Sequence, residues 1–102
     1  MSLLLQTPTK EIDVGFLVFV QRYATDLLKW DILTFFAHNP TFRGSLSQLA
    51  QQLRRSPHAL QPEIGDLVLV GILTQTPTPD SKTVYQLTEQ PHLRQMTLKF
   101  AD

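Results

Sequence analysis

The side chains best suited to chemistry are three arginines in a stretch of the chain that lacks acids. No Asp or Glu lies between Ile32 and Pro62, whereas Arg43, Arg54 and Arg55 do. Guanidinium groups form paired hydrogen bonds with phosphate oxygens, so this segment could contact a nucleic-acid backbone. The alternative is a solvated turn in which the arginines contact only water.

The formal net charge of the chain is zero, but the charges are unevenly spread. Residues 63–91 hold four acids against Lys82 alone, so an acidic segment follows the basic one. Proteins that bind nucleic acid without sequence preference are usually basic overall, because released counterions supply most of that affinity. The charge balance therefore predicts weak non-specific binding at most.

Metal sites, nucleophiles and cofactor sites have little support in the sequence. The chain has no cysteine, and its histidines, at positions 38, 58 and 92, lack a second ligand at helical metal spacing. Ser45, Ser47 and Ser56 fit helix caps, and no glycine-rich phosphate loop, nucleophile elbow or acid–base pair occurs. We therefore expect no enzymatic activity, no metal and no cofactor.

Two further features bear on where the protein works. A chain without cysteines fits the reducing cytoplasm, which is the location we expect. The longest apolar run, Val14 to Val20, is far too short to span a membrane, and the first residues do not resemble a secretion signal. We therefore expect no contact with a membrane.

The elements that position these side chains begin after a loose terminus at residues 1–7. Thr7-Pro8 is a helix-start signal, and a helix is expected over residues 8–24. The alternation of apolar residues over 12–20 is also compatible with a strand. Four apolar residues recur at helical spacing, which favours the helix: Ile12, Phe16, Phe19 and Val20.

A second helix is expected to start at Thr25 or Asp26, either of which can cap it, and to end at Ala37. Apolar side chains cover most of its circumference, so it should be the central buried helix. Core packing explains the aromatic residues of the chain better than a ligand pocket does. They include Trp30, Phe35, Phe36, Tyr85 and Phe100.

A tight pair of helices should follow, which together form a helix-turn-helix. Ser45-Leu46-Ser47-Gln48 matches a capping box and starts a short helix that runs to about Arg54. Ser56-Pro57 starts the next helix, and Gly71 suits the left-handed position that closes it.

The last third of the chain predicts a β-hairpin and a final helix. Strands are expected over 72–76 and 83–87, because a polar link with turn-forming residues joins them. Pro91 starts a helix over 91–102. The expected fold is therefore mainly α with a small β-hairpin, a winged helix-turn-helix with extra N- and C-terminal helices. All 102 residues should form one domain, with the winged-helix core over 25–90.

Residues 28–90 resemble winged-helix domains of the MarR/ArsR type. "LLKWDILTFF" resembles the buried first helix of that fold, and "LSQLAQQL" resembles its second helix. "LVLVGIL" resembles the end of the recognition helix, and "DSKTVYQLT" resembles the return strand of the wing. "KWDILTFFAHNP" and "YQLTEQPHLRQMTLKF" are also similar to segments of small bacterial winged-helix proteins. The resemblance implies a protein that binds double-stranded DNA and regulates transcription.

The resemblance also implies which side chains would contact DNA. Its groove-facing positions fall on Pro57, His58, Gln61 and Pro62, of which only His58 and Gln61 could bond a base edge. Phosphate contacts would come from the arginines and from the wing. The residues expected at the DNA surface are Arg43, Ser45, Arg54, Arg55, His58, Gln61 and Lys82.

Three features of the expected recognition helix argue against reading of bases. Pro62 removes a helical hydrogen bond, so either the helix kinks there or the regular helix begins at Pro62 and residues 57–60 form a separate turn. No Lys or Arg lies within 56–73. Glu63 and Asp66 are expected on the exposed side of the helix, where they would repel phosphate.

Two functions are therefore open. The first is a small DNA-binding regulator that forms a homodimer through residues 10–23 and 91–101 and binds two half-sites. The second is a protein-interaction module on the same fold, in which the apolar helix over 10–23 docks onto a partner. The fold and the arginines favour the first function, whereas Pro62 and the two acids favour the second.

Overall fold

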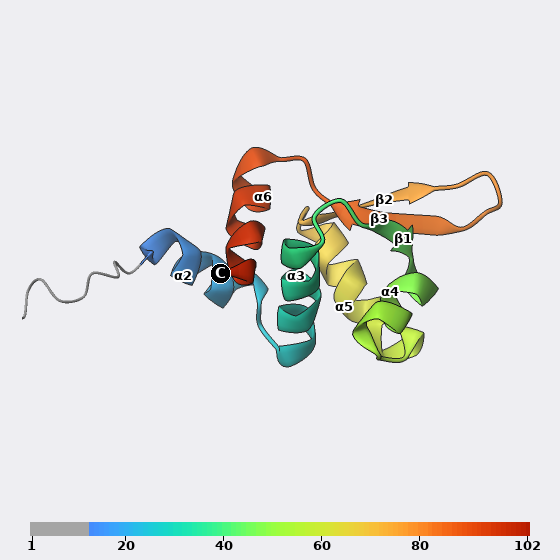
Figure 1. Ribbon diagram of the computed structural model, residues 1–102, viewed down its shortest axis with the longest axis horizontal. Coiled ribbons are helices and arrows are strands. Elements are labelled where there is room, and N and C mark those ends of the chain that lie inside the picture. The colour runs from blue at the N-terminus through green and yellow to red at the C-terminus, as the bar shows by residue number, and fades with distance from the viewer. Residues whose placement is uncertain (1–12) are drawn as a thin grey trace, which may run out of the picture.

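A computed structural model describes residues 13–102. These residues form five α-helices, three strands and a 3-10 helix, which in chain order are α2 (Val14–Tyr23), α3 (Leu27–His38), β1 (Arg43–Ser45), α4 (Leu46–Leu53), α5 (Pro57–Leu69), β2 (Leu73–Pro77), β3 (Thr83–Leu87), α6 (Pro91–Leu98) and η1 (Lys99–Ala101). The β2–β3 hairpin projects from one end of the helical body, and α2 lies at the other end (Figure 1). None of these helices is long and apolar enough to cross a membrane.

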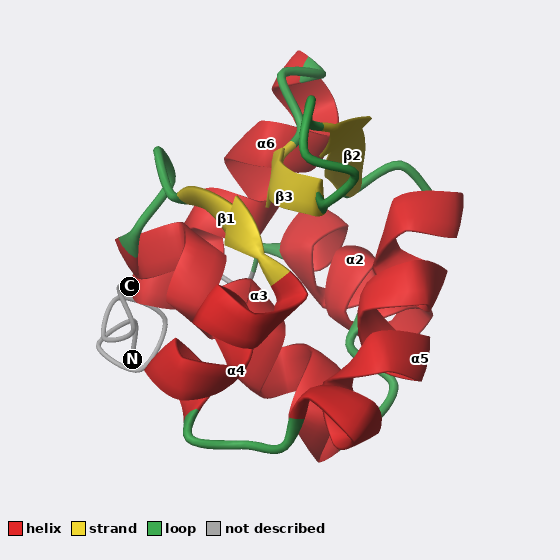
Figure 2. Ribbon diagram, turned by 90° about the vertical axis from the view of Figure 1, so that its right-hand side faces the viewer, coloured by secondary structure: helices red, strands yellow, loops and turns green. Residues whose placement is uncertain are grey.

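The strands form one antiparallel sheet in the order β1-β3-β2. The hairpin was expected from the sequence, and Gln75 of β2 lies opposite Tyr85 of β3. The strand β1 was not expected, because it has only three residues and depends on pairing with distant β3, where Gly44 lies opposite Tyr85. The sheet contacts α4 and α5, and Figure 2 views the hairpin end-on with these helices below it.

The hydrophobic core lies between α3, α4, α5 and the base of the sheet. Its largest fully buried apolar side chains are Ile32, Leu33, Phe36, Leu49, Leu60, Ile64, Leu67, Ile72, Leu73 and Leu87. The expectation that α3 is buried around its circumference holds for the middle of the helix and is wrong for its first turn. Leu27 is 81% exposed there, and Trp30 is 42% exposed although its ring packs edge-on against Phe100.

The caps expected for α4 and α5 are confirmed. The Gln48 N–H donates to the Ser45 hydroxyl and the Ser45 N–H donates to the Gln48 side chain, which is the reciprocal pair of a capping box. The Ala59 N–H donates to the Ser56 hydroxyl at the start of α5. Gly71 has φ +89°, and its N–H donates to the Val68 carbonyl, so it closes α5 as expected.

Helices α3 and α2 also start at side-chain caps, although the sequence offered other candidates for these positions. Asp26, not Thr25, caps α3 by accepting the Lys29 N–H. Asp13 caps α2 by accepting the Phe16 N–H, and the start signal at Thr7-Pro8 lies outside the described residues. Residues 14–23 form a helix and not a strand.

Helix α2 is held to the body through aromatic side chains on one face. The Phe16 ring lies 5.1 Å from the Phe100 ring of η1 in an edge-on arrangement, and Phe19 is buried. The opposite face carries Val14, Leu17 and Val18, which are 66%, 49% and 53% exposed. Helix α2 therefore presents an apolar stripe to solvent.

Helix α5 runs without a break through Pro62. The alternative in which the regular helix begins at Pro62 is therefore wrong. Proline has no N–H, so the carbonyl of His58, one turn earlier, receives no helical hydrogen bond from this position. The burial of Leu60 and Ile64 on either side of the proline keeps the helix in place despite this loss.

Candidate nucleic-acid interface

An open groove of about 700 Å³ lies between α4 and the β2–β3 hairpin. Most of its lining side chains carry hydroxyl or amide groups or a positive charge, and they include Ser45, Ser47, Gln48, Gln51, Thr78 and Lys82. Groups of this kind donate hydrogen bonds to phosphate oxygens in protein–DNA complexes. The groove can therefore accept a sugar–phosphate backbone by its chemistry, although Asp80 in the same lining opposes an anion.

The turn of the hairpin places Lys82 at the edge of this groove. The Thr78 N–H and the Thr78 hydroxyl both donate to the Lys82 carbonyl, at 2.7 and 2.8 Å, and fix the backbone there. The Thr78 hydroxyl shares its one hydrogen between this carbonyl and the Asp80 carboxylate, and the bond to the carboxylate lowers the pKa of Asp80. Asp80 is therefore charged, and the exposed Lys82 offsets that charge at the tip of the wing.

The three arginines of the acid-free segment lie in different surroundings. Arg43, on β1, donates from Nε to the Gln86 side chain of β3 at 3.1 Å. Arg55 donates to the Asp31 carboxylate of α3 at 2.6 Å, and both side chains are about half exposed. Arg54 caps the end of α4 with φ 57° and has no ion-pair partner among residues 13–102. Arg54 is thus the cation best placed to take a new anionic partner.

The outer surface of α5 is polar at its start and low in profile further along. His58, Gln61 and Pro62 are exposed. A Cβ atom built on Gly65 would meet nothing within 4 Å. The exposed His58 and Gln61 side chains carry groups that can bond a base edge, and Gly65 adds no side chain to this surface. The exposed Asp66 carboxylate, further along α5, opposes an anion.

The expected site residues come from two regions of the surface. Ser45 and Lys82 line the same groove, although the Ser45 hydroxyl also serves as a cap. Arg54 and Arg55 lie at the turn between α4 and α5, close in sequence to His58 and Gln61 on the first turns of α5. The sequence did not single out Gln48, Gln51 and Thr78, which share the groove with Ser45.

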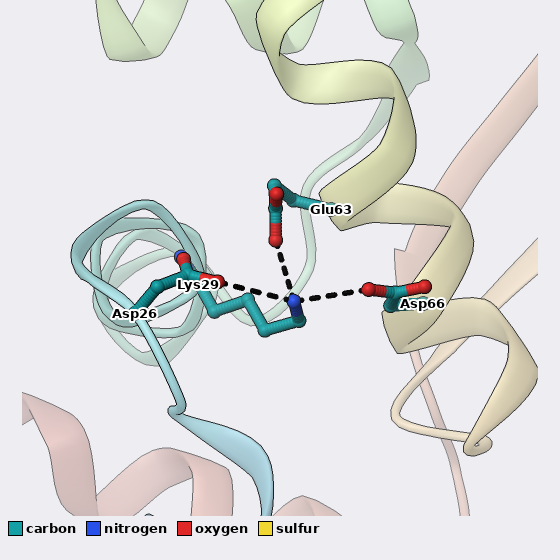
Figure 3. Close-up of polar contacts among 4 residues, drawn as sticks. All are labelled: Asp26, Lys29, Glu63 and Asp66. Atoms are coloured by element: carbon teal, nitrogen blue, oxygen red, sulfur yellow. Dashed lines mark hydrogen bonds and ion pairs between the residues drawn. The ribbon is translucent and has the colours of Figure 1, made fainter.

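Both acids of α5 contact a lysine of α3, which corrects the expectation for Glu63, whose side chain is 22% exposed. The Asp66 side chain is 60% exposed and lies on the exposed side as expected. Glu63 and Asp66 both contact the ammonium of Lys29 on α3, at 2.5 and 3.0 Å, and Asp26 contacts it at 3.2 Å (Figure 3). The Lys29 side chain is only 11% exposed. The sequence reasoning missed this cluster, and its one signal was a lysine within the otherwise apolar run "LLKWDILTFF".

Contacts within the cluster favour the charged forms of Lys29 and Asp26. Burial would by itself lower the pKa of Lys29, but its hydrogen bonds with Glu63, Asp66 and Asp26 together raise that pKa well above the ordinary lysine value. The pKa of Asp26 is lowered, first by the Lys29 backbone N–H and then, against the effect of burial, by the Lys29 ammonium. At neutral pH one cation therefore compensates both acids of α5 in part.

The comparison with known proteins gives structural matches only. The sequence matches no protein-family model and no curated protein. The structure of transcriptional regulator Tm0710 of Thermotoga maritima is similar to this one with a TM-score of 0.61 and 15% sequence identity. The match covers 86% of this chain and 63% of that one. The adhesin competence repressor AdcR of Streptococcus pyogenes has a TM-score of 0.54 and 22% identity, over 82% and 64%.

A third similar structure is a mutant of ZitR from Lactococcus lactis in its apo form. Its TM-score is 0.51 at 17% identity, over 89% of this chain and 69% of that one. Likeness at these identities shows the fold alone, and the winged helix-turn-helix fold expected from the sequence is confirmed. The chain spans less than two thirds of the length of Tm0710 and AdcR.

Proposed function

We propose that this chain binds double-stranded DNA as a homodimer and acts as a transcriptional regulator. The proposal is supported by the winged-helix fold, by two similar structures whose names are those of a transcriptional regulator and a repressor, and by the polar groove between α4 and the hairpin. Fold alone does not fix function, so the chemistry of the surface has to decide.

The observation that carries the proposal is the pairing of Glu63 and Asp66 with Lys29. Both carboxylates of α5 are turned toward α3 and share one ammonium. Their repulsion of phosphate was one argument from the sequence for a protein-interaction module, beside Pro62 and the lack of Lys and Arg over 56–73. With these acids engaged, the outer face at the start of α5 carries the neutral or weakly basic groups of His58 and Gln61.

In the proposed complex, α5 enters the major groove and the surrounding cations contact phosphates. His58 and Gln61 would bond base edges, as amide and imidazole groups do. Arg54 would contact the backbone at the turn before α5, while Arg43 and Lys82 would contact it from the sheet and the wing. Arg55 would contribute less, because Asp31 already holds its guanidinium.

A homodimer would raise the affinity for DNA and would cover the exposed apolar surface of α2. One copy offers few cations, and two copies double the number of phosphates that are neutralised. The stripe of Val14, Leu17 and Val18 on α2 is apolar, exposed and far from the hairpin (Figure 1). We therefore place the homodimer contact on α2, with residues 91–101 beside it.

The decisive test is binding of the purified protein to mixed-sequence duplex DNA at low and at near-physiological salt. We expect binding that weakens steeply as salt rises, because each phosphate contact releases a counterion. Selection of a preferred duplex from a random pool would then identify the base preference. Absence of binding at low salt would overturn the proposal and favour the protein-interaction module.

A further inference from the structure

Lys29 lies where α3 passes α5 and joins the two helices by its side chain. The ammonium contacts Glu63 and Asp66 of α5 as well as Asp26 of its own helix (Figure 3). Glu63 and Asp66 are three residues apart, so they lie on one side of α5 at different heights along its axis. One ammonium held at both heights restricts rotation of α5 about its axis.

Stability alone does not account for a charge in this position. Replacing a buried ion pair with apolar side chains of similar size is often neutral or stabilising. Hydrogen bonds between charged groups, however, have a required geometry, whereas apolar contacts have none. The side chains that α5 buries are the apolar Leu60, Ile64 and Leu67, so the contacts of Glu63 and Asp66 with Lys29 are the directional ones at this interface.

Pro62 shows where α5 needs such a contact. The helix lacks one internal hydrogen bond at Pro62, which weakens the joint between its first turns and the rest. Glu63 is the next residue, and its carboxylate takes the shortest of the three contacts with Lys29, at 2.5 Å. The side chains proposed to meet bases, His58 and Gln61, lie directly before that joint.

We propose that Lys29 is a positioning residue, which fixes the rotation of α5 and thereby determines which base edges Gln61 and His58 meet. The inference rests on the proposed DNA binding and assigns sequence preference to a residue that does not touch DNA. Lys29 acts through Glu63 and Asp66, so loss of either side of the cluster should have the same effect on preference.

Two variants with opposite changes of charge test the inference. Lys29→Met keeps an unbranched apolar chain in the buried position and removes one positive charge. The double variant Glu63→Gln, Asp66→Asn keeps Lys29 and removes two negative charges. For each variant and the wild type, affinity is measured for the preferred duplex selected with the wild type and for mixed-sequence DNA, at a temperature at which circular dichroism shows all three folded.

We expect both variants to lower the ratio of preferred to mixed-sequence affinity by roughly tenfold, the effect of losing one base contact. If the role of Lys29 were purely electrostatic, Lys29→Met would weaken binding to mixed-sequence DNA and the double variant would strengthen it. The ratio of preferred to mixed-sequence affinity would then stay the same in both. A merely structural role would lower the unfolding temperature and keep the ratio. Either result with a DNA-binding wild type would overturn the inference alone.

The proposed function has a separate point of failure in the same experiment. A wild type that binds no duplex at low salt overturns DNA binding and, with it, the role of Lys29. A wild type that binds all sequences equally leaves DNA binding in place and overturns only the positioning role. If Lys29→Met does not fold, the double variant measures the ratio by itself.

Discussion

Arg54 and Gln61 lie on either side of the Ser56 cap but should act differently on DNA. Arg54→Ala is expected to weaken binding to every sequence by a similar factor and to lower the salt slope by about 1, because one phosphate contact is lost. Gln61→Ala is expected to change mixed-sequence affinity little and to relax the preference at one base pair. Titrations against preferred and mixed-sequence duplexes measure both effects, and equal effects across sequences would contradict the role given to Gln61.

Asp26 provides a test of the charges around Lys29 through pH. Asp26→Ala is expected to lower the free energy of unfolding by about 1 kcal/mol at neutral pH, because the cap of α3 is lost. Asp26→Asn keeps a cap and loses only the charge. Its cost is expected to be a few tenths of a kcal/mol, because the Asp26 side chain is 44% exposed and water screens the ion pair.

The cost of Asp26→Asn should depend on pH with a definite sign. The pKa of Asp26 is lowered in the folded protein, so its stabilising effect is fully present above the ordinary carboxyl pKa. It should be lost as the pH falls from that value through the lower pKa of the folded state. Urea unfolding at a series of acid pH values measures this, and a difference that grows toward acid pH would contradict the assignment.

The residues that form this cluster illustrate what could not be read from the sequence. Asp26 could be identified as one of two candidate caps beside Thr25, because the partner of a cap lies within the next turn of the same helix. Lys29 and Glu63 are 34 positions apart, so their pairing exists only once α3 and α5 have packed. The expectation that Glu63 is exposed failed for the same reason, since helical spacing does not say which neighbouring helix carries a cation.

At the scale of elements, substitution by alanine should have opposite effects on stability at Gly65, inside α5, and at Gly71, just after it. Gly65→Ala is expected to raise the free energy of unfolding by about 1 kcal/mol, because alanine favours helix interiors and nothing obstructs its Cβ. Gly71→Ala is expected to lower that free energy by about 1 kcal/mol, because φ +89° is unfavourable for a residue with a side chain. Thermal unfolding measures both, and destabilisation by Gly65→Ala would show that the helix surface is less open there.

Helix ends could be predicted well, and the sheet only in part. The capping box at Ser45, the start at Ser56 and the closing glycine at position 71 are local chemistry, so the sequence shows them directly. Strands β2 and β3 are joined by a short link, so their pairing could also be predicted from residues that are close in sequence. Strand β1 has no such signal, because its three residues are defined by hydrogen bonds to β3.

At the scale of the whole molecule, the exposed stripe on α2 should control assembly. Leu17→Glu is expected to convert the proposed homodimer into a monomer and to weaken DNA binding, because a monomer binds only one half-site. The fold should persist, since Leu17 is 49% exposed. Sedimentation velocity measures the oligomeric state.

Gln52→Glu introduces the same charge at an exposed position of α4, away from the stripe on α2, and serves as the control for Leu17→Glu. It is expected to keep the oligomeric state of the wild type. A wild-type protein that is monomeric at tens of micromolar would contradict the homodimer. The sequence indicated an apolar helix in this region, but only the packing of Phe16 and Phe19 shows which face of α2 is left uncovered.

The chain also contains its own optical reporter. Trp30 is the only tryptophan, and its ring lies 5.0 Å from the Phe100 ring of η1 while part of it meets water. The emission wavelength of an indole depends on how much water surrounds it, so all of the tryptophan fluorescence arises at the junction of α3 with the C-terminal residues. Undocking of that end of the chain can therefore be followed in real time without a dye, by selective excitation of the indole.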